Sequence, residues 1–471
     1  MAPAMGDSAV DQTRPATPRR PLAAIVLAAG KGTRMKSALH KVLHPIAGRP
    51  MIEHLLAALG ELAPERTVVV VGDLREQLEQ RLAGRAEFAV QDPQLGTGHA
   101  VLQAQAALAG FEGDVLVLYG DVPFVSAGIM RALVERLHGE DAPEIAVLGF
   151  EPEDANHYGR VIANGDKIAW MVEHKDADEG QRACPLCNSG LLAARADALF
   201  ELLARVGNDN AQGEYYLPDA VNIAVEEGRT CVVVTVEDAD EVAGINSRAE
   251  LAEAEGRWQR ARRVRAMAEG ASLVAPETVF FSWDTRLGRD VTVEPNVVFG
   301  PGVEVADGAT IHAFSHLEGA RIAGGVSVGP FARLRPGAVL EAGSRVGNFV
   351  EVKNAVLGEG AKANHLTYLG DATVGAGANI GAGTITCNYD GYFKHRTEIG
   401  PRAFIGSNSA LIAPVRIGAD AIVAAGSAVS RDVAEGELRL VRAEQLVKPG
   451  WADRFHDAMK QKKAAAKGRE G

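Results

Sequence analysis

Residues 293–317, VEPNVVFGPGVEVADGATIHAFSHL, repeat one pattern every six residues. An aliphatic or aromatic side chain returns at the same phase, at Val293, Phe299, Val305, Ile311 and Leu317. With one-residue slips and one break at residues 388–391, the pattern continues to Val429. A six-residue period fits neither an α-helix nor a long flat strand, whereas short strands stacked coil on coil produce it around a continuous core. The sequence therefore predicts a parallel β-helix of hexapeptide repeats.

A glycine-rich β-sandwich is the alternative fold for this half, but it does not predict so regular a phase. The repeat by itself does not determine the handedness of the coil, and crossovers between parallel strands are normally right-handed. The repeats resemble those of acyltransferases that form a left-handed parallel β-helix. The prediction of a left-handed coil rests on that resemblance.

Length, composition and charge limit the classes of protein to which the chain can belong. With 471 residues, 47% of them apolar and 23% charged, the chain has room for two or three soluble domains. The net charge of -12 argues against a general nucleic-acid or membrane-surface binder, so an anionic ligand needs a local basic pocket. No apolar run approaches the roughly 20 residues that span a bilayer. The first twenty residues lack the apolar core of a secretory signal, which favours a cytoplasmic protein.

The cysteines do not suggest a disulfide framework or a zinc site. There are four, and Cys184 with Cys187 forms a single C-x-x-C without a second pair or suitably spaced histidines nearby. We interpret this pair as a chance occurrence in a loop and assign it no role. Cys231 opens an apolar run and is expected in the core.

The N-terminal half begins with a buried strand, residues 22–27, that leads into a glycine-rich turn, AAGKGTRM at 28–35. Such a turn at the carboxyl end of a strand brings backbone N–H groups close to a phosphate chain, and Lys31 and Arg34 add positive charge. It matches neither the Walker loop nor the dinucleotide G-x-G-x-x-G. As a bare pattern it is equally consistent with a simple tight turn.

Strands and helices then alternate, which favours a mostly parallel, Rossmann-like sheet with ligands at the carboxyl ends of its strands. We expect helices at 51–59, 73–83, 97–108, 194–205 and 217–226, strands at 67–71, 86–90, 115–118 and 230–236, and a hairpin at 158–173. Asp121 follows the strand at 115–118, where a carboxylate can hold Mg²⁺ beside phosphates or cap the next helix. Residues 247–269 contain strong helix formers, and Ser247 with Glu250 makes a capping-box pattern.

Taken together, the motifs of the two halves carry a resemblance to known enzymes. Leu27-Ala28-Ala29-Gly30-x-Gly32-Thr33-Arg34-Met35 with Lys41 resembles the nucleotide loop of sugar-1-phosphate nucleotidyltransferases. The runs NHLTYLGD (364–371), NIGAGT (379–384) and NYDG (388–391) resemble the bacterial bifunctional N-acetylglucosamine-1-phosphate uridyltransferase/glucosamine-1-phosphate acetyltransferase family. The resemblance covers roughly residues 20–450. Enzymes of that family acetylate glucosamine 1-phosphate with acetyl-CoA, then couple the product to UTP, releasing pyrophosphate and supplying UDP-N-acetylglucosamine for cell-wall and lipopolysaccharide synthesis.

The resemblance implies five segments. They are a disordered extension (1–20), a uridyltransferase domain (21–246), a linker helix (247–269), a left-handed β-helix acetyltransferase domain (270–450) and a flexible C-terminal tail (451–471). It also implies a cytoplasmic homotrimer whose loops help build active sites between subunits. Its partners would be small-molecule substrates, without nucleic acid or membrane.

In the first half, the resemblance implies a nucleotide and sugar site that works with Mg²⁺. The residues expected to serve the nucleotide or the sugar are Leu27, Ala28, Ala29, Gly30, Lys41, Gln91, Gly96, Thr97, Tyr119, Gly120, Asp121, Gly159, Glu173, Asn188 and Asn246. Asp121 and Asn246 would hold the metal. Because the sugar phosphate is itself the nucleophile, the protein has only to align the reactants and neutralise charge, a task for the metal, Arg34 and Lys41.

In the second half, the amine of glucosamine 1-phosphate must lose a proton to attack a thioester, which requires a general base. His365 matches the base of the family, whereas His312 and His316 read as structural residues. The phosphosugar would be held by Arg335, Lys353, Tyr368 and Asn379. Acetyl-CoA and the developing oxyanion would meet Ala382, Asn388, Tyr389, Ser407, Ala425 and Arg442.

Two other functions remain open on the sequence. One is a monofunctional sugar-1-phosphate nucleotidyltransferase whose β-helix only oligomerises or regulates; it would not need His365, Tyr368 and the 388–391 loop together. The other is a scaffold protein. The presence of charged residues in loops after strands, namely Arg34, Lys41 and Asp121, argues against it.

Overall fold

The computed structural model describes residues 20–155 and 158–467, so almost all of the expected N-terminal extension lies outside the described residues. The chain divides into two compact units, Met1–Arg260 and Ala261–Gly471. The division falls within helix α8 (Arg248–Ala268), where the sequence predicts a linker. The predicted capping box is confirmed at its start: Ser247 Oγ accepts from the backbone N–H of Glu250, and the Glu250 carboxylate accepts from that of Ser247, each at 3.2 Å. No helix within the described ranges is long and apolar enough to cross a membrane.

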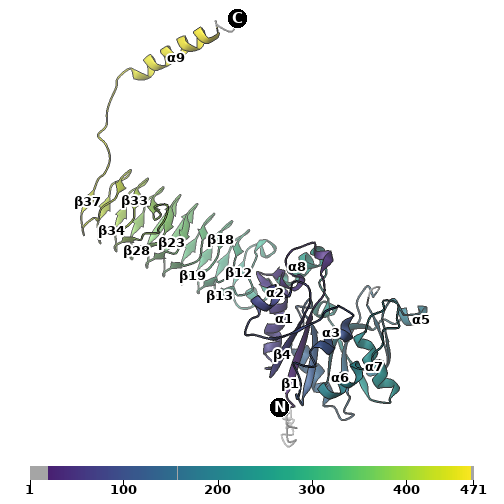
Figure 1. The fold of residues 1–471 in the computed structure, drawn as a ribbon. Coiled ribbons are helices and arrows are strands. Elements are labelled where there is room, and N and C mark those ends of the chain that lie inside the picture. Colours follow the sequence, from purple (N-terminus) through teal and green to yellow (C-terminus); the bar gives the residue numbers. More distant parts are fainter. Residues whose placement is uncertain (1–19, 156–157, 468–471) are drawn as a thin grey trace, which may run out of the picture. The chain divides into compact units, whose positions relative to one another are not determined.

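A nine-stranded sheet forms the centre of the first unit, in the order β5-β4-β1-β6-β10-β7-β11-β9-β8 (Figure 1). The strands β5, β4, β1 and β6 are mutually parallel, whereas β10 runs antiparallel to both β6 and β7. The strands are β1 (Leu22–Ala28), β4 (Arg66–Val71), β5 (Glu87–Val90), β6 (Asp114–Tyr119), β7 (Ile145–Phe150), β8 (Arg160–Asn164), β9 (Lys167–Val172), β10 (Cys187–Arg195) and β11 (Cys231–Val236).

Both faces of this sheet are covered, because successive side chains of a strand point to opposite faces. Along β1, Ala23, Ile25 and Leu27 join one buried cluster with residues of α3, α6 and α7, whereas Ala24 and Val26 join a second with residues of α1, α2 and α4. The helices are α1 (Met51–Gly60), α2 (Arg75–Arg81), α3 (Thr97–Gln103), α4 (Ala127–Leu137), α5 (Glu179–Arg182), α6 (Ala196–Leu203) and α7 (Leu217–Glu226). The result is the predicted doubly covered α/β sheet.

Short elements complete the first unit around the predicted loops. They are the 3-10 turns η1 (Thr33–Met35), η2 (Lys41–Leu43) and η3 (Ala239–Val242) and the small hairpin β2 (Pro45–Ile46) and β3 (Arg49–Pro50). A third buried cluster packs this hairpin against α8 through Ile46, Met51 and Ala254. The start of α8 is therefore held beside the loop that carries Lys41.

Several predicted element boundaries differ from the structure, and two of them show the cause. The helix expected from residue 194 begins at Ala196, because Ala194 and Arg195 still belong to β10 and pair with Val115 and Asp114 of β6. The helix expected over 97–108 ends as α3 at Gln103 and continues as turns. In both places an apolar run is compatible with either element, and contacts with the neighbouring strand or helix decide the outcome.

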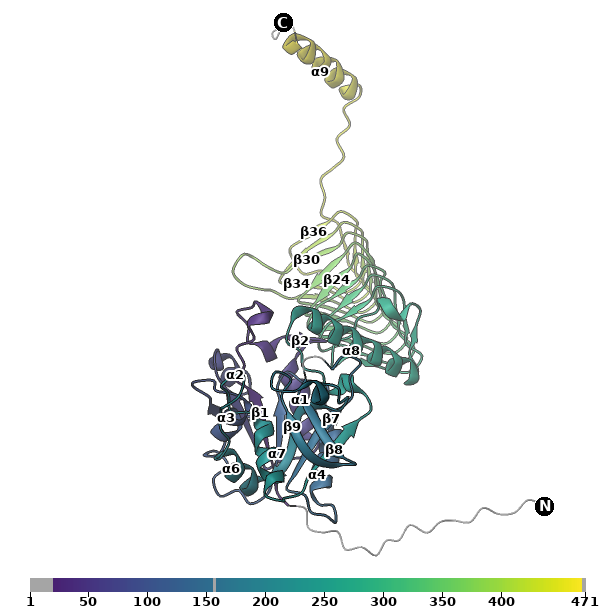
Figure 2. The same cartoon turned by 90° about the vertical axis from the view of Figure 1, so that its right-hand side faces the viewer.

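The second unit is a parallel β-helix made of three sheets, as the six-residue period predicts (Figures 1 and 2). The first sheet contains β12 (Ser272–Leu273), β14 (Thr292–Val293), β17 (Thr310–Ile311), β20 (Ser327–Val328), β23 (Arg345–Asn348), β26 (Lys362–His365), β29 (Asn379–Ile380), β32 (Phe404–Ile405), β35 (Ile422–Val423) and β37 (Leu438–Arg439). The second contains β13 (Arg286–Leu287), β16 (Glu304–Val305), β19 (Ala320–Ile322), β22 (Ala338–Leu340), β25 (Val356–Leu357), β28 (Ala372–Val374), β31 (Thr397–Ile399) and β34 (Val415–Ile417). The third contains β15 (Val298–Phe299), β18 (His316–Leu317), β21 (Arg333–Leu334), β24 (Glu351–Lys353), β27 (Tyr368–Gly370), β30 (Ile385–Cys387), β33 (Ala410–Ile412) and β36 (Ala428–Val429).

The repeated apolar residues stack on one another from coil to coil. Val293 pairs with Ile311, three hexapeptides further along, and both side chains are buried. Val305 pairs with Ile322, so a slip in the sequence pattern is a coil that is one residue shorter. The break in the pattern is an excursion: residues 388–396 leave the stack before β31 resumes it, and Figure 2 shows this loop standing out beside the labels of β30 and β34.

The end of the chain contains elements that the sequence analysis does not anticipate. A last short strand, β37, follows the hexapeptide repeats. The segment expected to be a flexible tail forms helix α9 (Trp451–Lys467). The side chains of this helix that the structure describes are exposed.

Candidate active sites

A cavity opens in the first unit at the carboxyl ends of β1 and β6, where parallel strands present their loops together. Gly120 after β6 donates its N–H to the carbonyl of Leu27 in β1 at 2.9 Å, which holds the two loops side by side. The cavity is lined by Leu27, Ala28, Ala29, Gly30, His40, Lys41, Val42, Gln91, Gln94, Gly96, Thr97, Ala100, Tyr119, Asp121 and Glu214. Of the residues predicted to serve the nucleotide or the sugar, the lining includes Leu27, Ala28, Ala29, Gly30, Lys41, Gln91, Gly96, Thr97, Tyr119 and Asp121.

At two glycines of this cavity the surroundings of the backbone differ: they are crowded at Gly96 and open at Gly30. Gly96 has a φ of +111°, and a Cβ there would lie 2.6 Å from the carbonyl oxygen of Tyr215, so only glycine fits. Gly30 has no described atom within 4 Å of the place of a Cβ. The turn after β1 therefore leaves room at its surface for a ligand to approach the backbone.

The two predicted metal ligands meet at one point of the cavity. Asp121 and Asn246, 125 positions apart in the sequence, both direct side-chain oxygens at the ammonium of Lys41. Lys41 Nζ lies 3.0 Å from Asn246 Oδ1 and forms an ion pair with Asp121 Oδ2, and both charged side chains are largely buried. Helix α4 is capped by Ser126, whose Oγ accepts from the N–H of Ile129 at 3.3 Å, so the helix-cap interpretation of Asp121 is wrong.

Two oxygens around one cation are a donor set suited to Mg²⁺, which binds proteins through one or two carboxylates and completes its shell with water and substrate phosphates. Within the described ranges no group of three or more His, Cys, Asp or Glu side chains is placed to hold a metal. Asp121 and Asn246 therefore fit a metal that substrate shares, and they do not form a closed structural metal site.

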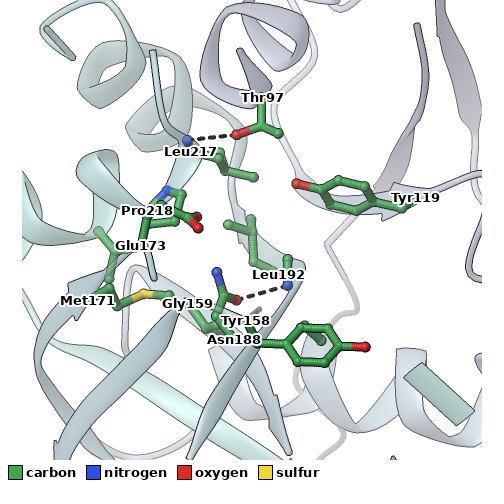
Figure 3. Close-up of a pocket in the computed structure, with 14 residues that line it drawn as sticks. Thr97, Tyr119, Tyr158, Gly159, Met171, Glu173, Asn188, Leu192, Leu217 and Pro218 are labelled. Atoms are coloured by element: carbon green, nitrogen blue, oxygen red, sulfur yellow. Dashed lines mark hydrogen bonds between the residues drawn. The ribbon is translucent and has the colours of Figure 1, made fainter. Parts of the chain in front are cut away.

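A second cavity adjoins the first and shares Thr97 and Tyr119 with it. Figure 3 shows Glu173, Asn188, Met171 and Leu192 around it. Its lining is Thr97, Tyr119, Val147, Tyr158, Gly159, Met171, Glu173, Asn188, Ser189, Gly190, Leu192, Leu217, Pro218 and Val221. The residues predicted on the sugar side, Tyr119, Gly159, Glu173 and Asn188, are brought together here.

The polar groups of this second cavity suit a ligand with hydroxyl and amide groups. Asn188 Oδ1 accepts from the N–H of Gly190 at 2.9 Å (Figure 3). This bond fixes the side-chain amide of Asn188, so that its NH₂ group points away from Gly190. Burial raises the pKa of Glu173, and the negative charges of Asp219, Asp176 and Glu214 raise it further. Burial, with the charges of Glu173 and Asp121, also raises the pKa of Tyr119, so its phenol stays neutral. The cavity thus holds polar donors and acceptors beside the apolar Met171 and Leu192.

Arg34 is the one predicted catalytic residue of this half that the structure does not bring to either cavity. It lies on η1 with an exposed side chain, and neither cavity is lined by it. Gly120 also stays outside the linings, but its hydrogen bond to Leu27 gives it a place in the scaffold of the site.

In the second unit, the predicted base lies at a corner of the β-helix. His365 ends β26, and its register partner one coil earlier is Asn348 of β23. His365 Nδ1 lies 2.7 Å from Asn348 Oδ1, an atom that can only accept. The imidazole hydrogen is therefore on Nδ1, and Nε2 is left with the lone pair that a general base needs. Sequence reasoning missed Asn348, because its partner stands 17 residues away in the chain.

The predicted acetyl-CoA residues occupy the same corner on the following coils. Asn408 donates its backbone N–H to the carbonyl of Ala382, and Gly426 donates to that of Ser407, each at 2.8 Å. Arg442 donates from Nη1 to the carbonyl of Ala425 at 2.9 Å. Stacking coils thus bring residues that are 17 to 25 positions apart in the sequence into one continuous row that begins at His365.

A group of positive charges lies on the adjoining sheet. Arg335 donates to Glu351 at 2.8 Å. The pKa of Lys353 is lowered by its contact with the amino group of Lys394 and then by the charges of Lys394 and Arg335. Three cations held together are an arrangement that a phosphate group stabilises. Lys394 comes from the loop at 388–396, and sequence reasoning missed it because the loop has no periodic position.

The buried amide of Asn388 anchors that loop to the stack. Asp371 accepts from the amide of Asn354 at 2.6 Å and from that of Asn388 at 2.5 Å. Partial burial opposes ionisation of Asp371, but these two hydrogen bonds and the charges of Lys394 and Lys353 keep its pKa below the usual value. Tyr368 and Asn379 lie nearby in β27 and β29, and Tyr389 is exposed on the loop. Asn379 belongs to the coil after that of His365, since β29 pairs with β26.

Next to the His365 corner, an exposed apolar row climbs the β-helix. Phe314, Phe331 and Phe349 are 54%, 45% and 56% exposed, and their rings stack with centroids 5.0 and 5.1 Å apart. Leu366, directly after His365, continues the row. All four residues have a positive φ, between 48° and 60°, which β-branched residues avoid. We call these four residues the aromatic row.

The cysteines are all reduced. The thiol of Cys184 contacts the carbonyl oxygen of Val161 at 3.4 Å, and that of Cys187 contacts the carbonyl of Pro185 at 3.5 Å. Cys231 is buried, as its apolar run predicts.

Comparison with known proteins finds a matching family model for each of the two units. The model of the MobA-like NTP transferase domain matches residues 24–215, and that of the bacterial transferase hexapeptide (six repeats) matches residues 284–319. Bifunctional protein GlmU of Sphingopyxis alaskensis is 73% identical over 445 residues, which are 94% of this chain and 98% of the relative. The protein of the same name from Novosphingobium aromaticivorans is 77% identical over 447 residues, 95% of this chain and 99% of the relative. The chain belongs to the GlmU family.

The GlmU relationship settles two of the alternatives left open by the sequence. Both units are covered by relatives that are named as bifunctional, at up to 77% identity, so the monofunctional and scaffold readings are set aside. The fold class is a Rossmann-like nucleotidyltransferase domain joined by a helix to a left-handed parallel β-helix of hexapeptide repeats. Among solved structures, UDP-glucose pyrophosphorylase complexed with UDP-glucose aligns at 20% identity and a TM-score of 0.42, covering 51% of this chain and 100% of the other.

Proposed function

We propose that this chain makes UDP-N-acetylglucosamine in two steps, each catalysed by one unit with the residues described above. As a GlmU-family member it is a bifunctional enzyme, a uridyltransferase and a glucosamine-1-phosphate acetyltransferase, and its substrates are small molecules that include UTP and acetyl-CoA. The observation that carries the assignment of residues is that each unit gathers its own reactive groups from distant parts of the chain. Lys41, Asp121 and Asn246 meet in the first, and His365 and Asn348 meet in the second.

For uridylyl transfer, we assign UTP to the first cavity and N-acetylglucosamine 1-phosphate to the second. The backbone from Leu27 to Gly30 faces the nucleotide, and Gln91 with Gly96 and Thr97 faces the base. Thr97 and Tyr119 stand where the two cavities meet, which is where the two substrates must touch. A phosphate oxygen of the sugar attacks the α-phosphorus of UTP, a P–O bond forms, and pyrophosphate leaves with the electrons of the bond that breaks. The protein supplies alignment and positive charge.

Asp121 and Asn246 would hold Mg²⁺ in this reaction. A bound magnesium ion supplies neutralisation of the phosphate charges as they approach one another. Lys41 stabilises the same two oxygens in the structure, so its ammonium becomes available to the phosphates when a metal binds there. Arg34 is exposed on the loop after β1 and would add charge from outside the cavity.

For acetyl transfer, His365 is the general base. Its Nε2 accepts a proton from the amine of glucosamine 1-phosphate, and the nitrogen forms a bond to the thioester carbonyl as the sulfur of CoA leaves. The phosphate of the sugar binds Arg335 and Lys353, joined by Lys394, with Tyr368 and Asn379 beside it. Acetyl-CoA follows the corner from His365 past Ala382, Ser407 and Ala425 to Arg442, with Asn388 and Tyr389 on the adjoining loop.

We further propose that the enzyme is a homotrimer in the cytoplasm, and that the aromatic row lies at the contact between its subunits. The row exposes three stacked phenyl rings, an apolar surface of a kind that marks an interface. Because Phe349 and Leu366 directly follow Asn348 and His365, a subunit on this row would border the acetyl-transfer site. The functional domains would be residues 21–246 and 270–450, joined by 247–269.

Two separate assays test the function. CoA release is followed with glucosamine 1-phosphate and acetyl-CoA, and pyrophosphate release is followed with N-acetylglucosamine 1-phosphate, UTP and Mg²⁺. His365→Ala is expected to abolish only the first activity, and Asp121→Ala only the second. Acetylation near the native rate in His365→Ala would show that the assigned base is wrong, and each variant serves as the folding control of the other.

A further inference from the structure

A histidine outside the predicted residues contacts the group assigned to the base of UTP. Gln91 follows β5, is only 4% exposed, and lines the first cavity. Its amide nitrogen lies 2.9 Å from the carbonyl oxygen of Gly96 and 3.1 Å from Nδ1 of His99. An amide NH₂ has two hydrogens, so these two contacts occupy both of them.

With its nitrogen engaged, Gln91 offers the cavity only its carbonyl oxygen, Oε1. No hydrogen bond to Oε1 is found among the residues that the structure describes. An acceptor held in this way selects a base with a ring N–H. Uracil presents N3–H between two carbonyl groups, whereas cytosine presents a lone pair at the same ring position, which an oxygen acceptor repels.

A neutral His99 can hold the Gln91 amide in this orientation. It belongs to the first turn of α3, and burial lowers its pKa, which favours the neutral ring with one bare nitrogen. Accepting from Gln91 requires that Nδ1 be the bare nitrogen and that Nε2 carry the hydrogen. Nε2 faces the amide of Gln103, one helical turn later, at 3.1 Å. The same amide nitrogen donates to the carbonyl oxygen of His99 at 3.0 Å, and a half-turn of the amide would exchange that bond for one that accepts the Nε2 hydrogen.

We propose that His99 is a positioning residue for base recognition, which makes the first cavity discriminate UTP from CTP by keeping the Gln91 amide from turning over. The inference rests on the proposed function, because it takes the first cavity to be the UTP site. Without an acceptor at the place of Nδ1, only the carbonyl of Gly96 still accepts from the Gln91 amide, so the orientation turned by half, which presents NH₂ to the base, becomes more accessible. That orientation repels N3–H of uracil and matches N3 of cytosine.

Two amide variants of the full-length enzyme test this proposal. In His99→Asn the side-chain oxygen takes about the place of Nδ1, whereas in His99→Gln it takes about the place of Nε2. The two variants therefore carry the same amide group and differ in where its oxygen lies. Pyrophosphate release is measured with N-acetylglucosamine 1-phosphate and Mg²⁺, with UTP or CTP. The UTP-to-CTP ratio of kcat/KM is expected to fall roughly tenfold in His99→Gln, mainly through KM for UTP, and to stay within about threefold in His99→Asn.

The outcomes separate this inference from the proposed function. If both variants keep the native ratio, or if both lose it equally, His99 does not act through an acceptor at Nδ1 and the inference is overturned. If the native enzyme releases no pyrophosphate from UTP, the proposed function fails first and takes the inference with it. CoA release and the thermal transition of each variant verify that the chain is folded.

Discussion

Asn348 and His365 lie on successive coils of the β-helix, with Asn348 Oδ1 2.7 Å from His365 Nδ1. The contact places the imidazole hydrogen on the side of Asn348 and leaves Nε2 as the basic nitrogen. The stacking of coils thereby determines which nitrogen of the proposed base can accept a proton.

Replacing this acceptor should weaken the base without removing it. We expect Asn348→Ala to lower kcat for acetyl transfer roughly ten- to hundredfold, which is at most the lower end of the 10²–10⁴-fold that general-base catalysis typically contributes. Asn348→Asp keeps an oxygen at the same place and should retain most of the rate. CoA release measures both variants, and pyrophosphate release by the other unit is the internal control. A native kcat in Asn348→Ala would show that the contact has no part in catalysis.

Lys394 should matter for binding the phosphosugar more than for chemistry. Its amino group contacts Lys353 beside Arg335, so Lys394→Met removes one of three cations from the phosphate site. A hydrogen bond to a charged group contributes about 1.5–3 kcal/mol, so KM for glucosamine 1-phosphate should rise roughly tenfold or more while kcat changes little. Arg286→Met, on an exposed position of a different sheet, is the matched control. Equal KM values for the two variants would exclude Lys394 from the site.

The wall of the sugar cavity depends on a glycine. Gly190 has a φ of +85°, and a Cβ there would lie 2.8 Å from the ring of Tyr119. We expect Gly190→Ala to raise KM for N-acetylglucosamine 1-phosphate at least tenfold and to destabilise the first unit by about 1–3 kcal/mol. Gly165→Ala is the control, since its φ of +64° imposes similar backbone strain but no atom of the described residues lies within 4 Å of the new Cβ. If both variants behave alike, strain and not the lost space explains the effect.

The two activities should differ in their need for metal. Chelation of divalent cations is expected to abolish pyrophosphate release, because Asp121 and Asn246 are proposed to hold a Mg²⁺ ion whose remaining ligands come from substrate phosphates and water. CoA release, which relies on His365, should be unchanged in the same solution. Restoring Mg²⁺ should restore the first activity. Metal-independent uridylyl transfer would remove the assigned role of both residues.

The aromatic row should control assembly. Phe331→Glu places a charge in the middle of the stacked rings. Both residues have a Cβ, so the positive φ at this position is as demanding for the variant as for the native residue. We expect the variant to sediment as a monomer in analytical ultracentrifugation and to lose most acetyl transfer while keeping uridylyl transfer. Trp170→Glu, at an exposed aromatic residue of β9, is the control. A trimer that survives Phe331→Glu would place the contact elsewhere.

The features that sequence predicts well are those that are repeated along the chain. The six-residue period predicts the coils, and its slips are the shorter coils, as the pairing of Val305 with Ile322 shows. The alternation of strand and helix patterns predicts a sheet that is covered by helices on both faces. The motif of the turn after β1 predicts the contiguous lining residues Leu27, Ala28, Ala29 and Gly30, and the family resemblance adds residues that follow other strands, such as Gln91 and Asp121.

Tertiary structure decided what depends on the register between distant segments. Asn348 meets His365 because one coil is 17 residues long, Lys394 meets Lys353 because a loop folds back, and His99 meets Gln91 across a turn and the start of a helix. The antiparallel entry of β10 between β6 and β7 likewise comes from pairing over distance. A local pattern determines which side chains are buried, but the hydrogen bonds that orient catalytic groups depend on distances that only the folded chain sets.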